Sequence, residues 1–405
     1  MSWEKVKLGD ITDSCLGKML DKNKNRGDYQ PYLANINVRW GSFDLDNLSE
    51  MKFLDTESER YGIKYGDLII CEGGEPGRCA IWKEQIPNMK IQKALHRVRV
   101  HEGVDYRYIY YWFLFAGKRK ALDQYFTGAT IKHMPGDKLK TILIDLPPFD
   151  IQKKISDILS AYDDLIENNQ KQIKLLEEAA QRLYKEWFID LRFPGYEDVE
   201  IVDGVPEGWL IKPFSDVFEF VRGKSYSTKE LSEKDGTLMV NLKNIRAFGG
   251  YNRGAEKRFI GKFKETQKLF PGDIVMGVTD MTQERRLVGH VAMIPECNED
   301  LTFSMDLIKL LPISVTRNYL YCAMQYGGYS DKISPLANGV NVLHLKPDSI
   351  MNMEMLVPDF GMLSIFDSAF EPIRMKIDTL QKQCIFAMEA RDRLLPKLMN
   401  GLIEI

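Results

Sequence analysis

The stretch "TGATIKHMPGDKLKTILIDLPPFDIQKKI" (Thr127–Ile155) recurs in altered form as "NGVNVLHLKPDSIMNMEMLVPDFGMLSIF" (Asn338–Phe366). Four residues keep their identity at a constant offset of 211 positions and without a gap: Gly128 and Gly339, His133 and His344, Asp137 and Asp348, Pro147 and Pro358. A solenoid would repeat over a far shorter period. The repeat therefore predicts two copies of one domain within the 405 residues.

The repeat continues towards the N-terminus of each copy. "NVR" (37–39) resembles "NIR" (244–246), and "YGDLII" (65–70) resembles "PGDIVM" (271–276). The apolar strings "DLIIC" and "DIVMGV" are typical of strands, whereas "YRYIYYWFLF" and "RNYLYCAMQY" are typical of short buried helices. Each copy is therefore predicted to be a mixed α/β lobe.

A long helical segment follows each lobe. Apolar residues recur in alternating steps of four and three, which is the heptad pattern of a coiled-coil seam. The predicted seam consists of Ile155, Leu159, Tyr162, Ile166, Asn169, Ile173, Leu176, Leu183, Phe366, Phe370, Ile373, Ile377, Leu380 and Leu394. Asp150 is predicted to cap the first helix. Pro372 predicts a kink or a fresh start in the second helix.

These patterns predict an α+β fold in which two tandem α/β lobes are separated by two long helices. The helices are expected to pack as an antiparallel coiled coil with pseudo-two-fold symmetry. The predicted boundaries are residues 1–148 and 209–358 for the lobes, 149–190 and 359–405 for the helical regions, and 191–208 for a linker.

Composition excludes several classes of protein. The net charge is only −3, but each lobe has a small excess of Lys and Arg, whereas residues 151–208 are acidic. No apolar run is long enough to span a membrane and no signal sequence is visible, so we expect a cytoplasmic protein. The six cysteines form no C-x-x-C pair, and no nucleophile–base constellation is recognisable. We therefore expect neither a metal site nor a catalytic site.

The string "LPPFDIQKKISDILSAYDDLIENNQKQIKLLEEAAQRLYKEWF" resembles the first conserved helical region of type I restriction-modification specificity subunits. The ending "RDRLLPKLMNGLIEI" resembles their C-terminal conserved region, and "GDLII", "TGATIKHM" and "NGVNVLHL" resemble strings in their target-recognition domains. The resemblance covers almost the whole chain.

This resemblance implies a function. Each lobe would be a target-recognition domain that reads one half of a bipartite, asymmetric site in double-stranded DNA. The helices would set the spacer between the halves and recruit two methyltransferase subunits, which use S-adenosylmethionine. Two restriction subunits, driven by ATP and Mg²⁺, would complete the complex. The chain itself would bind no cofactor and would be a non-catalytic subunit.

The candidate DNA-contacting residues are side chains that can read base edges or bind phosphates. They are Arg39, Arg78, Lys93, His96, Arg97, Lys132 and His133 in the first lobe, and Lys243, Asn244, Arg246, Arg253, Lys257, Arg258, Arg285 and Arg286 in the second. His133 and His344 recur at equivalent positions, which favours a shared scaffold role over base reading.

Two alternatives stay open from the sequence. The chain could be the specificity subunit of a related bipartite system that cuts on both sides of its site. It could instead be a coiled-coil scaffold whose lobes bind proteins. DNA binding that weakens steeply as salt rises would separate a DNA reader from a protein scaffold.

Overall fold

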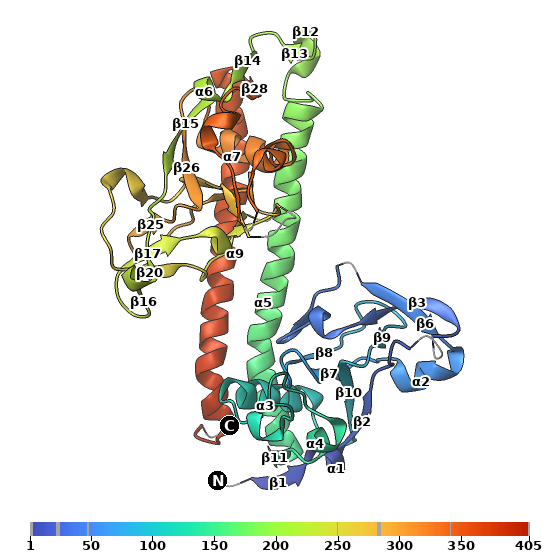
Figure 1. The fold of residues 1–405 in the computed structure, drawn as a ribbon. Coiled ribbons are helices and arrows are strands. Elements are labelled where there is room, and N and C mark those ends of the chain that lie inside the picture. The colour runs from blue at the N-terminus through green and yellow to red at the C-terminus, as the bar shows by residue number, and fades with distance from the viewer. Residues whose placement is uncertain are drawn as a thin grey trace. The chain divides into compact units, whose positions relative to one another are not determined.

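A computed structural model describes residues 3–21, 25–46, 48–248, 250–281, 285–340 and 342–403. Within it the chain forms two compact units (Figure 1). The first comprises the residues up to 167 together with those from 384 onward, and the second comprises residues 168–383. Each unit thus contains one lobe and part of each long helix, α5 (Phe149–Tyr184) and α9 (Phe360–Met399).

The first unit is built around a four-stranded antiparallel sheet. Its order is β2 (Thr12–Leu16), β10 (Leu95–Val100), β7 (Leu68–Cys71) and β8 (Cys79–Ile81). A second sheet has the order β6 (Ser49–Phe53), β3 (Asp28–Leu33) and β9 (Lys90–Ile91), and β1 (Glu4–Lys7) pairs with β11 (Leu143–Leu146). The remaining elements are α1 (Leu8–Ile11), β4 (Val38–Arg39), β5 (Ser42–Phe43), α2 (Ser58–Tyr61), α3 (Tyr106–Lys118) and α4 (Gly136–Lys140).

The second unit repeats the four-stranded sheet and the two-stranded pair, and it enlarges the remaining sheet. Its four-stranded sheet has the order β15 (Phe218–Arg222), β26 (Leu307–Pro312), β22 (Ile274–Gly277) and β24 (Val291–Met293), and β14 (Leu210–Pro213) pairs with β28 (Glu354–Val357). A five-stranded sheet has the order β16 (Leu231–Ser232), β20 (Lys257–Phe259), β17 (Thr237–Val240), β25 (Leu301–Phe303) and β21 (Lys268–Leu269). The other elements are α6 (Phe214–Val217), β18 (Ile245–Arg246), β19 (Gly250–Tyr251), β23 (Thr279–Asp280), α7 (Arg317–Tyr326), α8 (Tyr329–Ile333) and β27 (Leu343–His344), with the hairpin β12 (Ile201–Val202) and β13 (Val205–Pro206) before the lobe.

Matching contacts confirm that the two lobes are copies of one design. The hydroxyl of Tyr108 donates to the carbonyl of Asp145, and 211 positions later the hydroxyl of Tyr319 donates to the carbonyl of Leu356. The strands predicted at "DLIIC" and "DIVMGV" are β7 and β22, and the predicted buried helices are α3 and α7. The repeat seen in the sequence is therefore a repeat of topology.

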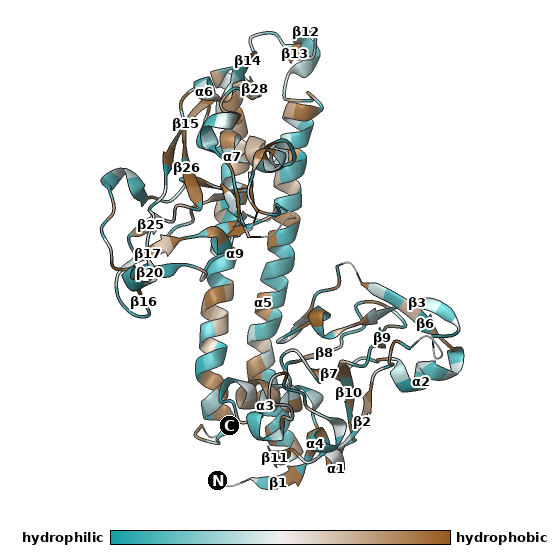
Figure 2. Ribbon diagram, viewed as in Figure 1, coloured by the Kyte–Doolittle hydropathy of each residue, from teal (hydrophilic) through white to brown (hydrophobic). Residues whose placement is uncertain are grey.

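Each lobe has an apolar core to which the long helices contribute. In the first unit, Ile155 of α5 and Leu398 of α9 are buried in the same cluster as Phe113 of α3. In the second, Phe366 of α9 lies in the same cluster as Tyr319 of α7. Hydrophilic and hydrophobic residues alternate along α5 and α9 (Figure 2), as expected of helices that bury one face.

Within each unit the segments of α5 and α9 run antiparallel. In the first unit Asp163 binds Arg391, and the thiol of Cys384 donates to the carbonyl of Ile166. In the second, Asn169 Nδ2 donates to Gln383 Oε1 at 3.1 Å, and the rings of Trp187 and Phe366 lie 5.8 Å apart. All fourteen predicted seam residues are buried or half-buried. The heptad pattern therefore identified the buried face of both helices.

The fresh helix start predicted as one possibility at Pro372 was wrong, as was the N-cap predicted at Asp150. The helix α9 continues through Pro372, because Phe370 before the proline and Ile373 after it pack into one core. A kink at Pro372, the other possibility, stays a prediction. The helix α5 begins at Phe149, one residue before Asp150. Asp150 therefore lies in the first turn, where its charge favours the positive end of the helix dipole.

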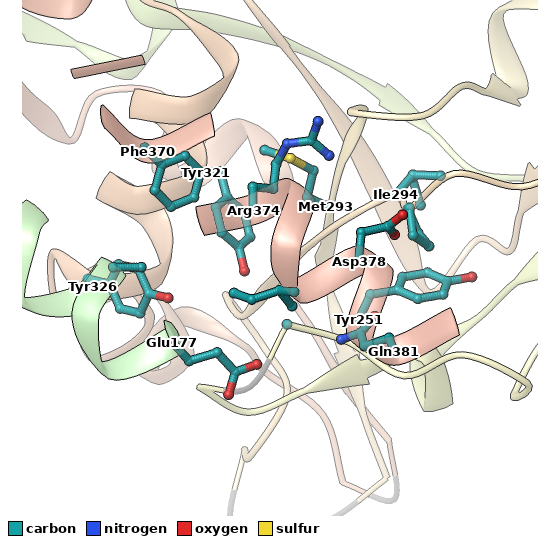
Figure 3. Close-up of a pocket in the computed structure, with 14 residues that line it drawn as sticks. Glu177, Tyr251, Met293, Ile294, Tyr321, Tyr326, Phe370, Arg374, Asp378 and Gln381 are labelled. Atoms are coloured by element: carbon teal, nitrogen blue, oxygen red, sulfur yellow. The ribbon is translucent and has the colours of Figure 1, made fainter. Parts of the chain in front are cut away.

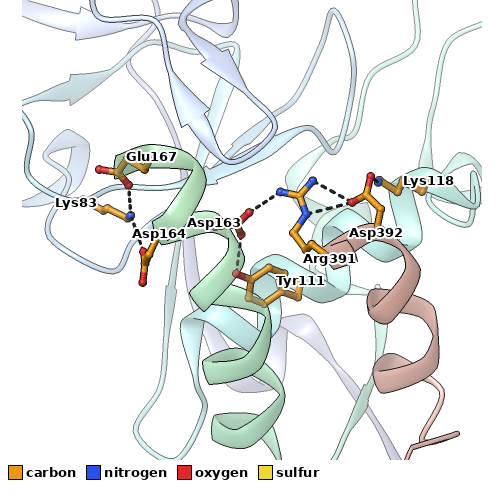
Figure 4. Close-up of polar contacts among 8 residues, drawn as sticks. All are labelled: Lys83, Tyr111, Lys118, Asp163, Asp164, Glu167, Arg391 and Asp392. Carbon is orange, nitrogen blue, oxygen red and sulfur yellow. Dashed lines mark hydrogen bonds and ion pairs between the residues drawn. The ribbon is translucent and has the colours of Figure 1, made fainter. Parts of the chain in front are cut away.

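A polar network joins α3, α5 and α9 in the first unit (Figure 4). Asp163 accepts a hydrogen bond from Tyr111 at 2.7 Å and pairs with Arg391, which also binds Asp392 at 3.0 Å; Asp392 in turn pairs with Lys118. Arg391 stands at the one step of the second helix's heptad pattern that lacks an apolar residue. The charge at this step is mostly buried and is neutralised by its partners.

Replacing Arg391 with Ala is expected to lower the free energy of unfolding of the chain by roughly 2–4 kcal/mol, because Asp163 is left partly buried without its cation. Replacing Arg393 with Ala is the matched control. Arg393 lies two residues further along α9, and its side chain is 80% exposed. That change should alter stability by less than about 0.5 kcal/mol. Urea unfolding of both variants measures the difference, and equal losses would contradict a structural role for the Asp163–Arg391 pair.

Candidate nucleic-acid interface

Three loop segments of the first lobe meet beside the C-terminal end of β7. The Asn35 amide donates to the carbonyl of Gly73 at 3.4 Å, and a guanidinium nitrogen of Arg78 donates to the carbonyl of Asn35 at 2.9 Å. Gly73 also forms a β-bridge with His133. The loops around residues 34–41, 72–78 and 127–134 thus form one continuous surface, which we call the first loop cluster.

A small hairpin closes each loop cluster. The backbone groups of Thr127 and His133 exchange two hydrogen bonds of 2.8 Å, and those of Asn338 and His344 do the same at 2.9 and 3.0 Å. The second residue of each hairpin is a glycine, Gly128 or Gly339. A Cβ at Gly128 would lie 2.2 Å from the carbonyl oxygen of Ile131, and a Cβ at Gly339 would lie 2.0 Å from that of Val342. The recurring glycine therefore holds the same backbone turn in both lobes, whereas His133 and His344 contribute their backbone groups to it. The scaffold role of the two histidine side chains stays a prediction.

The second lobe builds the equivalent surface, the second loop cluster, from residues 241–248, 279–287 and 338–345. The strand β23 pairs with β27, so that Thr279 lies opposite His344. The ring of Phe248 lies 4.5 Å from that of His290, which anchors the 241–248 loop beside this pair. Residues 282–284 and 341, whose numbers fall within these ranges, lie outside the part of the chain that is described.

Several predicted DNA-contacting residues are exposed on the two clusters. In the first they are Arg39, Lys132 and His133; in the second, Lys243, Arg246 and Arg286 are exposed and Arg285 is half-exposed. Arg39 lies 3.4 Å from Asp44, and Lys132 lies 3.6 Å from Asp123. Exposed ion pairs of this kind contribute little energy, so these cations can exchange their partners for phosphates.

Three other predicted residues are buried and serve the fold. The side chain of His96 is 1% exposed and donates to the carbonyl of Met134 at 2.9 Å, and burial lowers its pKa. Arg97 donates to the carbonyls of Glu59, Arg60 and Gly62. Asn244 is fully buried and caps its own loop by accepting from the backbone of Asn241. We therefore leave these three out of the interface, because their polar atoms face the protein interior.

The remaining predicted residues are half-buried and engaged with protein partners. Lys257 donates to the hydroxyl of Tyr226 at 2.6 Å, Arg258 pairs with Glu299, and Arg78 pairs with Glu75 at 2.9 Å. Lys93 is half-buried in the turn between β9 and β10. The structure does not bring these four side chains to the tips of the loop clusters.

The side chain of Arg253 binds the long helix α9. Its guanidinium pairs with Asp378 of α9 and donates to Gln381 at 3.2 Å. Both partners line a pocket between α5, α7 and α9 in the second unit (Figure 3). Glu177 of α5 lies at this pocket, where burial raises its pKa to about 7 against the opposing effect of Arg246. The burial of the Glu177 carboxyl indicates that this pocket belongs to the packing between the lobe and the helices.

Exposed apolar residues at the loop tips were not predicted from the sequence. Ile36 and Ile131 in the first cluster and Met281 in the second are largely exposed. A signal was available only for Ile131, because the seven-residue turn from Thr127 to His133 must project the side chains between its ends. Together with the neighbouring cations, these exposed apolar side chains form an amphipathic surface.

The relatives of this chain share one description. A family model described as "Type I restriction modification DNA specificity domain" matches residues 1–178. The MjaIX specificity subunit of a type I restriction enzyme from Methanocaldococcus jannaschii is 26% identical over 84% of this chain and 78% of its own length. The MjaVIII specificity subunit from the same organism is 22% identical over the whole chain and 93% of its own length.

The chain is similar to type I restriction-modification specificity subunits over its whole length.

The fold agrees with that similarity. The crystal structure of the type I restriction-modification S subunit from M. genitalium superposes with a TM-score of 0.60 at 16% identity, over 98% of this chain and 96% of that one. This superposition confirms the fold that the resemblance of "LPPFDIQKKI" and "RDRLLPKLM" implied.

The described part of the chain offers no cluster of three or more His, Cys, Asp or Glu side chains that could hold a metal ion. Cys15, Cys71, Cys79, Cys297 and Cys322 are free thiols. Among the described residues, every helix is too short or too polar to cross a lipid bilayer.

Proposed function

We propose that this specificity subunit reads a bipartite, asymmetric sequence in double-stranded DNA, one half with each lobe. One observation carries the proposal: the two lobes share a topology and a glycine-closed loop cluster, while the exposed side chains of the two clusters differ. A common scaffold with different tips suits two readers of different half-sites. An asymmetric site needs this divergence, because two identical readers would favour a palindrome.

The exposed Arg and Lys side chains of both loop clusters would supply the polar contacts to DNA. Arg39 and Lys132 in the first cluster, and Lys243, Arg246 and Arg286 in the second, would bind phosphates or guanine edges. The apolar tips Ile131 and Met281 would contact thymine methyl groups or the sugar edge. The sequence preference of each lobe would then depend on the exposed side chains of its loop cluster, and the sheets of that lobe would hold these loops in place.

The long helices would set the spacer between the half-sites and recruit two methyltransferase subunits. Those partners would supply S-adenosylmethionine and the methyl transfer, and two restriction subunits would use ATP and Mg²⁺ for translocation and cleavage. The specificity subunit would contribute recognition without catalysis. It would act in the cytoplasm, where DNA and the partner subunits are present.

Replacing both Arg39 and Lys132 with Gln should weaken DNA binding by the complex of this chain with its methyltransferase subunits. The slope of log affinity against log salt should become shallower by about 2, since each lost phosphate contact changes it by about 0.9. Fluorescence anisotropy across a salt series measures both quantities. Lys5→Gln is the matched control, because this side chain of β1 is 67% exposed and lies outside the loop cluster. Equal affinity and slope in the double variant and the control would overturn the assigned surface, and salt-independent binding would favour a protein scaffold.

A further inference from the structure

The first lobe contains a lysine whose charge is buried without an anionic partner. Lys90 of β9 is only 3% exposed, and its ammonium donates one hydrogen bond, to the carbonyl of Asn88 at 3.1 Å. An ammonium has three N–H donors. Among the described residues, no carboxylate lies within ion-pair distance of it, and burial lowers the pKa of Lys90 against the opposing effect of Asp55. The cation therefore has donors that the protein itself leaves unused.

The other two buried lysines in the described part of the chain are both neutralised. Lys18 binds Glu57 at 2.5 Å, and Lys309 lies 3.6 Å from Asp273. Each of the two also donates to a backbone carbonyl. Such pairing is the rule, because a buried charge without a counter-ion is costly to desolvate. Lys90 departs from this rule, and a counter-ion from outside the chain would complete its site.

The second lobe shows that the fold does not require this charge. Lys90 forms a β-bridge with Gly62, and the residue that pairs in the same way in the second lobe is Thr302, opposite Lys268. The strands β9 and β25 also run parallel to equivalent strands of their lobes, β3 and β17. Thr302 is fully buried and donates from its hydroxyl to the carbonyl of Gln267 at 2.9 Å. A small neutral side chain thus fills this position of the shared fold.

The ammonium of Lys90 lies on the floor of a cleft of about 610 Å³ in the first lobe. The helix α2 and the residues after it form one wall, and the segment that leads into β9 forms the other (Figure 1). A Cβ on Gly62 would lie 3.7 Å from Lys90 Nζ, and both Gly62 and Asn88 line the cleft. Ile63 and Met89 are buried beside them and make the floor apolar. An apolar cleft of this size with a buried polar group is typical of a site for a small molecule.

The cleft is separate from the first loop cluster. Its residues precede β7 and follow β8, whereas the loop at 72–78 joins the other ends of these two antiparallel strands. The strands β7 and β8 therefore lie between the cleft and the loop cluster. Occupation of the cleft would be a function beyond the reading of DNA by that cluster.

We propose that this cleft binds a small monocarboxylate with an apolar body, whose carboxylate accepts a hydrogen bond from Lys90 Nζ. One buried ammonium neutralises one negative charge. Glu59 and Glu84 are exposed at the rim of the cleft, where they would repel a second negative charge against the single exposed cation of Lys64. These charges favour a carboxylate over a dianionic phosphate, and the apolar floor favours an aromatic or aliphatic body.

Isothermal titration calorimetry of the full chain with benzoate tests the proposal. Benzoate should bind the unmodified chain with a Kd of about 1 mM or tighter, as expected of a ligand of this size. Its neutral counterpart benzamide should bind at least about tenfold more weakly, because it lacks the charge that Lys90 neutralises. Phenyl phosphate, which is mostly a dianion at neutral pH, should also bind more weakly than benzoate.

Lys90→Thr should lower the affinity for benzoate by at least about tenfold. The variant should fold normally by circular dichroism, because Thr302 fills the same position of the second lobe. Lys64→Thr is the matched control, because Lys64 lines the same cleft but is exposed. It should change the affinity by less than about threefold. The comparison with benzamide uses the unmodified chain, so it does not depend on the folding of any variant.

Equal affinities of the unmodified chain and Lys90→Thr for benzoate would overturn the proposal, as would the absence of benzoate binding at about 20 mM. Benzamide that binds as tightly as benzoate would show that Lys90 neutralises no ligand. Tighter binding of phenyl phosphate than of benzoate would overturn the assignment of a carboxylate. Weaker DNA binding by Lys90→Thr with unchanged benzoate affinity would instead make Lys90 a DNA contact.

Discussion

Replacing residues 209–358 with the corresponding lobe of another specificity subunit will change one half of the recognised DNA sequence completely and leave the other half unchanged. Each lobe has its own core, its own four-stranded sheet and its own loop cluster. The four described strands of each four-stranded sheet all come from its own lobe. The determinants of a half-site should therefore move with the lobe that carries them.

The reciprocal replacement of residues 1–148 is the control for this exchange. It should alter the other half-site and preserve the one that the first exchange changed. Sequencing of methylated DNA from cells that carry each hybrid subunit measures both halves at once. A hybrid in which both half-sites change together would show that the lobes do not read independently.

Inserting four residues after Gln170 of α5 will lengthen the spacer between the half-sites by one or two base pairs. Four helical residues add about 6 Å. B-DNA advances about 3.4 Å per base pair, taking a turn of 34–36 Å as about ten base pairs. The seam repeats on average every 3.5 residues, which is half a heptad. An insertion of four residues departs from this repeat by only half a residue, so much of the seam can pack again. The half-site sequences should stay the same, because neither loop cluster is altered.

An insertion of the same length in the linker is the control. Gly204 lies in an exposed turn between β12 and β13, outside α5 and α9. Four residues added there should leave the spacer unchanged. If both insertions change the spacer equally, or if neither does, helix length does not set the distance between the half-sites.

The sequence predicted the repeat, the main strands and the buried face of the helices because each of these has a period. The offset of 211 residues placed Tyr108 and Tyr319 in equivalent positions, and the steps of four and three placed Ile166 and Phe370 on the buried face. Periodicity also has limits. Pro372 breaks the local helical preference, but the apolar residues on both sides of it hold the helix together.

The candidate interface was harder to predict, because a cation looks the same in a sequence whether it faces solvent or a carbonyl. Arg97 and Arg39 both stand in or beside short strands, yet Arg97 binds three carbonyls inside the lobe and Arg39 is exposed. Arg253 pairs with a residue 125 positions later, on α9. Such pairings depend on tertiary contacts that no local pattern encodes.

Methylome sequencing of a host that expresses the methyltransferase subunit, with and without this chain, tests the central claim most directly. With the chain present, we expect methylated adenines at a single motif made of two different half-sites separated by a fixed spacer. Without it, that motif should lose its methylation throughout the genome. Persistence of the motif in the absence of the chain, or methylation at an uninterrupted motif in its presence, would contradict the account.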